Sequence, residues 1–279
     1  MRVDVPLRWA DLDAQGHVNN GRFIDYLQDA RADFLAGTPA GDLIAQGLTV
    51  VNNQIEYRAP IQFSNSPIQV DVSVCAVAAD SVWLAYTLWQ NERETAVART
   101  KLAAVDLATH QRRDLPEPAR AYFASIVEPL PPLRAVVWLP MTAAAKATPM
   151  RVRWSDLDAY GQVNNAMMFD YIQEGRIAFT AAAVVGLNDS PDEGYLWFVV
   201  RQDVAYLTRI VFRQDPYMVR TGVAHMGRTS LTFCSQIDDP QTGTICAQAS
   251  TVAVFADGRG QPVPVLEQWK QALEAYRLD

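Results

Sequence analysis

Apolar and polar residues alternate along four stretches in the first half of the chain, with the period of two that is typical of β-strands. These stretches are rich in β-branched and aromatic residues and cover residues 48–57, 68–77, 81–89 and 96–107. Four similar stretches follow in the second half, at residues 197–206, 217–224, 229–237 and 244–255. Turn-forming residues separate them, so each half is predicted to contain a meander of strands.

A helical period precedes each meander, after a short expected strand at residues 3–9 or 150–154. Apolar residues recur there at a spacing of three to four, at Phe23, Leu27, Ala30 and Phe34 and again at Met168, Ile172, Gly175 and Phe179. Each helix is therefore expected to bury one face. One helix followed by a meander predicts an α+β fold in which an antiparallel sheet wraps around a central helix.

Two similar polar strings stand where the predicted helices begin. "RWADLDAQGHVNNGRFIDYLQDAR" starts at Arg8 and "RWSDLDAYGQVNNAMMFDYIQEGR" starts at Arg153, an offset of 145 residues. After a longer loop in the second copy, an offset of 149 aligns further pairs, such as Ala98 with Ala247. A repeat this long indicates two homologous domains rather than a solenoid of short units.

The domain boundaries follow from this duplication and from the prolines between the two copies. We expect a first domain at residues 1–127, a stiff proline-rich connector at 128–148 and a second domain at 149–279. A short helix is expected at residues 119–126. The spacing of Leu266, Trp269, Leu273 and Tyr276 predicts a helix in the matching place of the second half.

Composition and charge exclude several classes of protein. Of the 279 residues, 49% are hydrophobic, which is enough for a sizeable core. The formal net charge of -7 offers no basic field for nucleic acid. No apolar run is long enough to span a bilayer, so we expect a cytoplasmic protein. Cys75, Cys234 and Cys246 have no metal-like spacing and are expected to be small buried residues without a disulfide.

The pattern D-x-D-x-x-G-H-V-N-N, followed by an aromatic-bearing helix with an acidic residue and "AR", resembles the hotdog-fold acyl thioesterases of the 4-hydroxybenzoyl-CoA thioesterase type. It is similar also to the acyl-ACP thioesterases. The resemblance implies two tandem hotdog domains paired as a pseudo-dimer, with the sites at their interface. It implies a small-molecule acyl thioester as substrate, with acyl carrier protein as an alternative carrier. No metal or separate cofactor is expected, since CoA or phosphopantetheine enters with the substrate. The chain would be a monomer or a homodimer.

The same resemblance implies that the second aspartate of D-x-D, Asp13 or Asp158, is the nucleophile or general base. Amides of the first helical turn would polarise the thioester carbonyl, because a helix N-terminus carries partial positive charge. The substrate-binding residues there are expected to be Gly21, Arg22 and Phe23, with Ala166, Met167 and Met168 in the second copy. His17 would assist as a hydrogen-bond partner or base. Two roles remain open, helix capping or a part in the site, for Asn19, Asn20, Asn164 and Asn165.

The sequence departs from the acyl-ACP pattern D-x-N-x-H in both copies. Gln15 replaces the asparagine in the first copy, while Tyr160 and Gln162 replace both the asparagine and the histidine in the second. Glutamine does not titrate, so the second site either works through Asp158 and the helix dipole alone or has lost activity.

Structural roles are expected for several neighbouring residues. Asp11 and Asp156 should bond the backbone of their own turns. Asp29 and Glu174, where another hotdog branch has its catalytic carboxylate, are expected to be solvated or paired with Arg31 and Arg176. Tyr26 and Tyr171 should pack with their hydroxyl groups bonded. Candidates for binding the phosphates of CoA are Arg58, Arg99 and Lys101, with Arg209 and Arg213 in the second half.

The sequence is also compatible with two other functions. A hotdog hydratase or dehydratase would need an acid–base pair over the acyl chain, and only the first copy offers one, Asp13 with His17. A non-catalytic acyl-CoA-binding module would keep the fold without the chemistry. An Asp13 carboxylate fully occupied by Arg8 or Arg153 would favour this last reading.

Overall fold

The computed structural model describes residues 1–13, 15–183 and 196–279. The chain divides into two compact units, Met1–Arg134 and Ala135–Asp279. The division lies within the proline-rich range predicted to be the connector.

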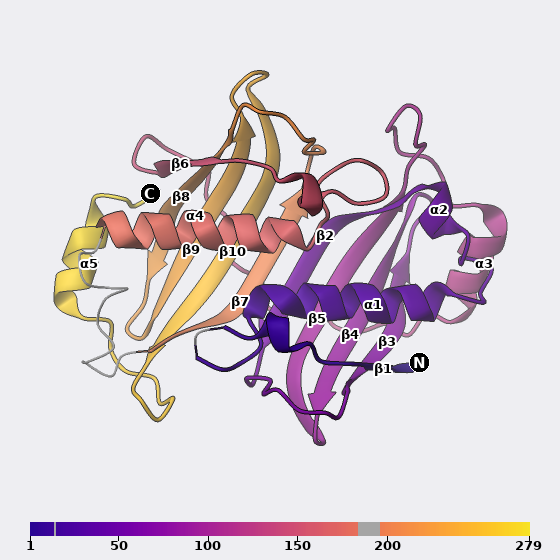
Figure 1. The fold of residues 1–279 in the computed structure, drawn as a ribbon, viewed down its shortest axis with the longest axis horizontal. Coiled ribbons are helices and arrows are strands. Elements are labelled where there is room, and N and C mark those ends of the chain that lie inside the picture. Colours follow the sequence, from indigo (N-terminus) through magenta and orange to yellow (C-terminus); the bar gives the residue numbers. More distant parts are fainter. Residues whose placement is uncertain (14, 184–195) are drawn as a thin grey trace. The chain divides into compact units, whose positions relative to one another are not determined.

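The first unit is one antiparallel sheet with a long helix lying across it (Figure 1). Its strands follow the order β1-β3-β4-β5-β2 across the sheet. They are β1 (Arg2–Val5), β2 (Leu48–Tyr57), β3 (Ile68–Val77), β4 (Ser81–Gln90) and β5 (Arg93–Ala104). The helices are α1 (Phe23–Leu35), α2 (Leu43–Gly47) and α3 (Glu117–Ser125). The predicted helix and meander are thus confirmed, with α2 as a short addition.

The second unit repeats this arrangement, with strand order β7-β10-β9-β8-β6. The strands are β6 (Lys146–Met150), β7 (Leu196–Tyr206), β8 (Tyr217–Met226), β9 (Ser230–Asp239) and β10 (Thr244–Ala256). The helices are α4 (Met167–Ala183) and α5 (Glu267–Glu274). The first strand of this unit was predicted too late in the sequence, because its residues Lys146–Met150 include a proline and show no clear alternation.

The apolar stripe of each long helix packs into the core, as its period predicts. Phe23, Leu27, Ala30 and Phe34 are each no more than 5% exposed. Phe179 of α4 lies in a buried cluster with residues of β8, β9, β10 and α5. At the position where α1 has Ala30, α4 has Gly175, and a Cβ atom added there would overlap the side chain of Val219 on β8. This glycine lets α4 approach its sheet closely.

Strand pairing shows that the two units differ by an insertion of two residues. Tyr86 pairs with Ala98 in the first unit, and Ser235 pairs with Ala249 in the second. Ser235 lies 149 residues after Tyr86, whereas Ala249 lies 151 residues after Ala98. The alignment of Ala98 with Ala247 in the sequence is therefore wrong by two positions. The hairpin loop is longer by two residues in the second unit, since Asn91 and Glu92 alone link β4 to β5.

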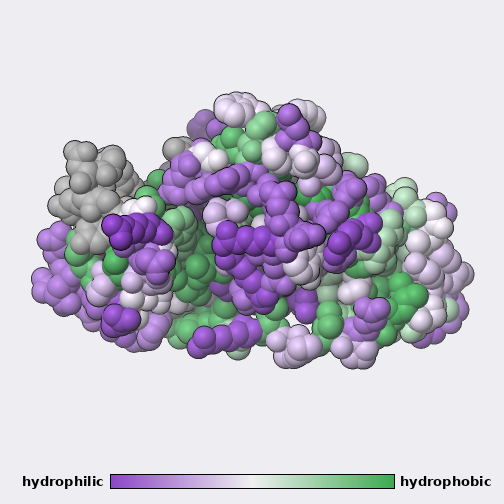
Figure 2. All heavy atoms as spheres, turned by 90° about the horizontal axis from the view of Figure 1, so that it is seen from below, coloured by the Kyte–Doolittle hydropathy of each residue, from purple (hydrophilic) through white to green (hydrophobic). Residues whose placement is uncertain are grey.

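Hydrophilic side chains predominate on the face drawn in Figure 2, with hydrophobic patches between them. The exposed hydrophobic residues include Trp9 and Trp154, at 73% and 74% exposure. Each packs edge-on against a phenylalanine, Phe63 at 5.6 Å and Phe212 at 5.3 Å between ring centroids. Among the described residues, no helix is long and apolar enough to cross a membrane.

Replacing Gly175 by valine tests the close approach of α4. The added side chain overlaps Val219, and overpacking of this kind lowers the free energy of unfolding by about 1–3 kcal/mol. Chemical denaturation measures the change. Ala181→Val, an exposed site on the same helix, should shift the free energy by less than about 0.5 kcal/mol. Helix propensity alone would slightly stabilise Gly175→Val and slightly destabilise Ala181→Val, so an unchanged or raised stability of Gly175→Val would contradict the packing argument.

The three cysteines should react slowly with thiol reagents in the folded protein. All are free; Cys234 and Cys246 are buried and Cys75 is half-buried. Burial raises the pKa of the Cys246 thiol to about 11, with the nearby Asp239 and Asp238 adding to the rise. At pH 8 its reactive thiolate is therefore scarce. Titration with a disulfide reagent should find three fast-reacting thiols only after denaturation. Fast reaction of Cys246 in the native protein would contradict this.

Candidate active site

The polar turn before α1 is tied to the helix by a buried hydrogen bond. Asp11 is 9% exposed, and its Oδ2 accepts a hydrogen bond of 2.8 Å from the hydroxyl of Tyr26. Burial, and then the bond to Asp11, raises the pKa of this hydroxyl, so it remains a donor. The predicted packing of Tyr26 is confirmed.

The second unit repeats this contact. The hydroxyl of Tyr171 donates to Oδ2 of Asp156, which is 5% exposed. The same carboxylate accepts the backbone N–H of Arg153 at 3.0 Å, as predicted for an aspartate that bonds its own turn. The carboxylate of Asp11 instead accepts a hydrogen bond from Tyr26 of the helix. Its role is therefore structural, as predicted, but it bonds the helix and not the backbone of its own turn.

The carboxylate of Asp13 is held on one side only. Its Oδ1 accepts the backbone N–H groups of Gln15 at 2.8 Å and His17 at 3.2 Å. The main chain closes the turn, since the N–H of Asp13 donates to the carbonyl of His17 at 2.8 Å. Within the described part of the chain, Oδ2 accepts no hydrogen bond. Arg8 pairs with Asp29 at 3.7 Å rather than with Asp13. One oxygen of Asp13 is thus anchored and the other is available.

Asp158 has the same anchor but a covered second oxygen. Its Oδ1 accepts the N–H of Tyr160 at 2.8 Å and that of Gln162 at 3.3 Å. Its Oδ2 accepts the side-chain amide of Gln162 at 3.3 Å. In the first unit the residue in that place is His17, whose imidazole makes no hydrogen bond to the residues that the structure describes. The exchange of histidine for glutamine therefore changes the state of the carboxylate itself.

Asn19 and Asn164 cap the segments that lead into the long helices. Oδ1 of Asn19 accepts the N–H of Gly21 at 2.9 Å, and Oδ1 of Asn164 accepts that of Ala166 at 3.0 Å. The carbonyl groups of both asparagines accept the next amides, those of Arg22 and Met167. These four amides are thus already bonded.

Asn20 and Asn165 have a different role from their neighbours. Their carbonyl oxygens accept hydrogen bonds from Tyr57 of β2 at 2.8 Å and Tyr206 of β7 at 3.0 Å. They therefore fasten each helix start to the sheet. Of the predicted substrate-binding residues, Phe23 and Met168 are almost fully buried, at 2% and 3% exposure. Arg22 is half-buried and pairs with Asp25 at 3.1 Å.

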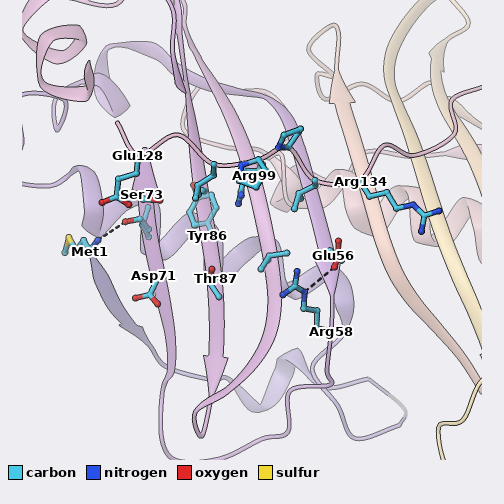
Figure 3. A pocket seen from close by; sticks show the side chains of 17 residues that line it. Met1, Glu56, Arg58, Asp71, Ser73, Tyr86, Thr87, Arg99, Glu128 and Arg134 are labelled. Atoms are coloured by element: carbon cyan, nitrogen blue, oxygen red, sulfur yellow. Dashed lines mark hydrogen bonds and ion pairs between the residues drawn. The ribbon is translucent and has the colours of Figure 1, made fainter. Parts of the chain in front are cut away.

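The arginines expected to bind phosphates lie elsewhere in the first unit. Arg58 and Arg99 line a cavity of about 620 Å³ that the segment 128–134 crosses (Figure 3). Arg58 is paired with Glu56 and Glu94, and the cavity also has Asp71 and Glu128 on its wall. Among its lining residues are none of the described residues between Trp9 and Arg22, and Lys101 is absent too. The cavity is of mixed charge and separate from Asp13.

The carboxylates further along each helix are exposed, as expected. Asp29 is 49% exposed at its side chain, and Glu174 is exposed. The predicted partner of Asp29 was wrong, however, because Asp29 pairs with Arg8 while Arg31 is buried at 8% exposure. Among the described residues, no group of three His, Cys, Asp or Glu side chains could hold a metal ion.

Solved structures of thioesterases share the fold of this chain. A protein assigned as an oleoyl thioesterase from Lactobacillus plantarum matches with a TM-score of 0.72 and 15% identity, over 95% of this chain and 96% of that one. An acyl-ACP thioesterase from Bacteroides thetaiotaomicron matches with 0.64 and 14%, over 92% and 96%. The 12:0-ACP thioesterase from Umbellularia californica matches with 0.69 and 12%, over 92% and 97%. At such low identities these matches establish the fold.

Comparison by sequence identifies the family. No curated protein matches the chain. The model of the thioesterase-like superfamily matches twice, at residues 7–123 and 152–273, once for each unit. The two matches cover most of the chain and both contain the D-x-D turn and the long helix. The chain therefore belongs to the thioesterase-like superfamily, as a tandem pair of hotdog units.

Proposed function

We propose that the protein hydrolyses acyl thioesters of CoA or of acyl carrier protein, with Asp13 as the reacting carboxylate. The observation that carries the proposal is the state of Asp13. Two backbone amides fix its Oδ1, whereas its Oδ2 accepts no hydrogen bond within the described residues. A fixed carboxylate with an available oxygen at a helix start suits attack on a carbonyl or on the water that attacks it.

Two chemical routes share these parts. As a nucleophile, Oδ2 would bond to the thioester carbon while the carbon–sulfur bond breaks, and water would then hydrolyse the mixed anhydride. As a general base, it would take a proton from water as that water attacks, and return the proton to the departing thiolate. Either way the positive end of the α1 dipole would stabilise negative charge on the carbonyl oxygen.

The first unit is the better candidate for the working site. Gln162 donates its side-chain amide to Oδ2 of Asp158, which lowers the electron density available on that oxygen. His17 leaves the matching oxygen of Asp13 open and can exchange a proton. We infer that Asp13 carries most of the turnover.

Replacing each aspartate by asparagine tests this assignment. Asparagine keeps the Oδ1 contacts to the turn but removes the nucleophile or base, so Asp13→Asn should lower kcat about 10²–10⁴-fold. Asp158→Asn should have a much smaller effect. Release of free thiol from short, long and aromatic acyl-CoAs measures both. Equal partial losses would mean two working sites, and loss in Asp158→Asn alone would overturn the assignment.

Replacing His17 by glutamine should cover the second oxygen of Asp13 in the way that Gln162 covers that of Asp158. The new amide can donate to Oδ2 of Asp13 as Gln162 does to Asp158, so kcat should fall about tenfold, the equivalent of one hydrogen bond to a charged group. His110→Gln makes the same chemical change between β5 and α3 and should leave turnover unaltered. Full activity in His17→Gln would show that the imidazole has no part in the reaction.

A further inference from the structure

Each unit exposes one tryptophan at the start of its D-x-D turn. Trp9 is 73% exposed and Trp154 is 74% exposed, more than any other large hydrophobic residue that the structure describes. An indole ring in water forgoes the free energy that burial of so large an apolar surface supplies. The two rings occupy equivalent places, because they stand four residues before Asp13 and Asp158. An exposure that is repeated in both units indicates a role other than packing.

A phenylalanine fixes the orientation of each indole. The ring of Phe63 meets that of Trp9 edge-on, with 5.6 Å between the centroids and 85° between the ring planes. Phe212 meets Trp154 in the same way, at 5.3 Å and 84°. An edge-on contact holds a ring while using little of its surface, so most of each indole stays open to a further contact.

The aromatic pair of the first unit is joined to the backbone of the Asp13 turn. Trp9 begins a 3-10 helix of three residues that ends two residues before Asp13. The segment that carries the phenylalanine lies beside the same turn, since Gln62 forms a β-bridge with His17 and directly precedes Phe63. The open indole therefore has a fixed place relative to the carboxylate proposed to react.

The span from Asp13 to Trp9 suits the arm of coenzyme A. The two positions differ by four, so their Cα atoms lie at most about 14 Å apart. The pantetheine arm has about twelve bonds between its sulfur and its terminal oxygen, as many as four residues of backbone, and extends about as far. A thioester whose carbonyl meets Asp13 can therefore bring its nucleotide to Trp9.

An arginine stands next to each open indole. Arg8 precedes Trp9, and its side chain is 68% exposed. Its ion pair with Asp29, at 3.7 Å, joins two exposed groups, so it contributes little and leaves several N–H donors of the guanidinium to other acceptors. Arg153 precedes Trp154 and is exposed as well. A flat ring beside an arginine matches a nucleotide, whose base stacks and whose phosphates accept charge-assisted hydrogen bonds.

The surroundings of Trp9 favour a nucleotide over the surface of another protein. Of the described residues at 8–22 and 60–67, Trp9 and Phe63 are the large hydrophobic ones that are exposed. The exposed residues around them include polar ones such as Gln15, Gln62 and Asn65. A protein interface needs a broad apolar centre within several hundred Å² of buried surface. A base needs one open ring face.

We propose that Trp9 stacks on the adenine ring of coenzyme A and that Arg8 binds its phosphates, so that the preferred substrates are thioesters of coenzyme A and not of acyl carrier protein. This substrate class rests on the function proposed above. Trp9 is then a specificity residue that acts on the carrier of the acyl group. Because Gln162 covers the carboxylate of Asp158 in the second unit, the effect on turnover should follow Trp9 more than Trp154.

The test compares decanoyl-CoA with decanoyl-pantetheine, which has the same arm and acyl group but no nucleotide. The wild type should show a kcat/KM at least about tenfold higher for decanoyl-CoA, as expected for base stacking with charge-assisted bonds. Trp9→Ala should lower the value for decanoyl-CoA about tenfold, mainly through a higher KM, and that for decanoyl-pantetheine much less. Trp9→Phe should keep part of the preference. Trp138→Ala, at an exposed tryptophan outside both turns, should keep the wild-type ratio.

Two results of these assays would overturn the nucleotide site. Equal losses in Trp9→Ala for decanoyl-CoA and decanoyl-pantetheine would show that the indole supports the turn and not the nucleotide. A loss for decanoyl-acyl carrier protein that exceeds the loss for decanoyl-CoA would show that Trp9 contacts a protein carrier.

Binding of non-hydrolysable thioethers separates this inference from the proposed function. S-decyl-CoA should bind the wild type more tightly than S-decyl-pantetheine by calorimetry, and Trp9→Ala should remove most of the difference while circular dichroism shows an intact fold. Such binding without any hydrolysis would support the nucleotide site and overturn the thioesterase proposal. Hydrolysis of decanoyl-CoA with no preference over decanoyl-pantetheine, in turnover or in binding of the thioethers, would overturn the nucleotide site alone.

Discussion

A single buried hydrogen bond in each unit holds the chemistry in place. It joins a tyrosine of the long helix to the first aspartate of the D-x-D turn, Tyr26 to Asp11 and Tyr171 to Asp156. A buried carboxylate without a donor would be costly, so the helix and the turn cannot easily move apart. The second aspartate of the D-x-D turn lies two residues later, so the same contact also fixes its position. The geometry of Asp13, the carboxylate proposed to react, thus depends on a contact that lies outside the proposed reaction.

The two units share this arrangement but differ at the second aspartate of the turn, Asp13 or Asp158. Both anchor one carboxylate oxygen on two backbone amides, and they differ in what meets the other oxygen. One change of side chain, His17 to Gln162, accounts for the difference without any alteration of the turn. Duplication followed by such a change allows one copy to keep the reaction while the other keeps only the architecture.

The sequence predicted the helix and the strands well because their burial follows simple periods. It predicted a polar turn before each helix but assigned the bonds to the turn's backbone to Asp11 and Asp156. In the structure Asp13 and Asp158 make such bonds, and of the two expected residues only Asp156 does. The sequence did not predict the burial of Arg31. Its position beside the apolar stripe favours burial, whereas its positive charge favours exposure to water. Only the strand pairing places Asn53 opposite Thr100, and Tyr86 opposite Ala98, inside the sheet. Those residues come from β2 and from the later hairpin of β4 and β5.

The longer hairpin between β9 and β10 also bears on how the two copies could diverge. Side chains of a strand point alternately to either face, so a shift of one residue would have turned the whole of β10 inside out. The shift is of two residues, which preserves the parity of the strand: Ala249 and Thr251 face inward as Ala98 and Thr100 do. The two added residues thus lie in the loop, and they renumber β10 without changing which of its side chains face the core.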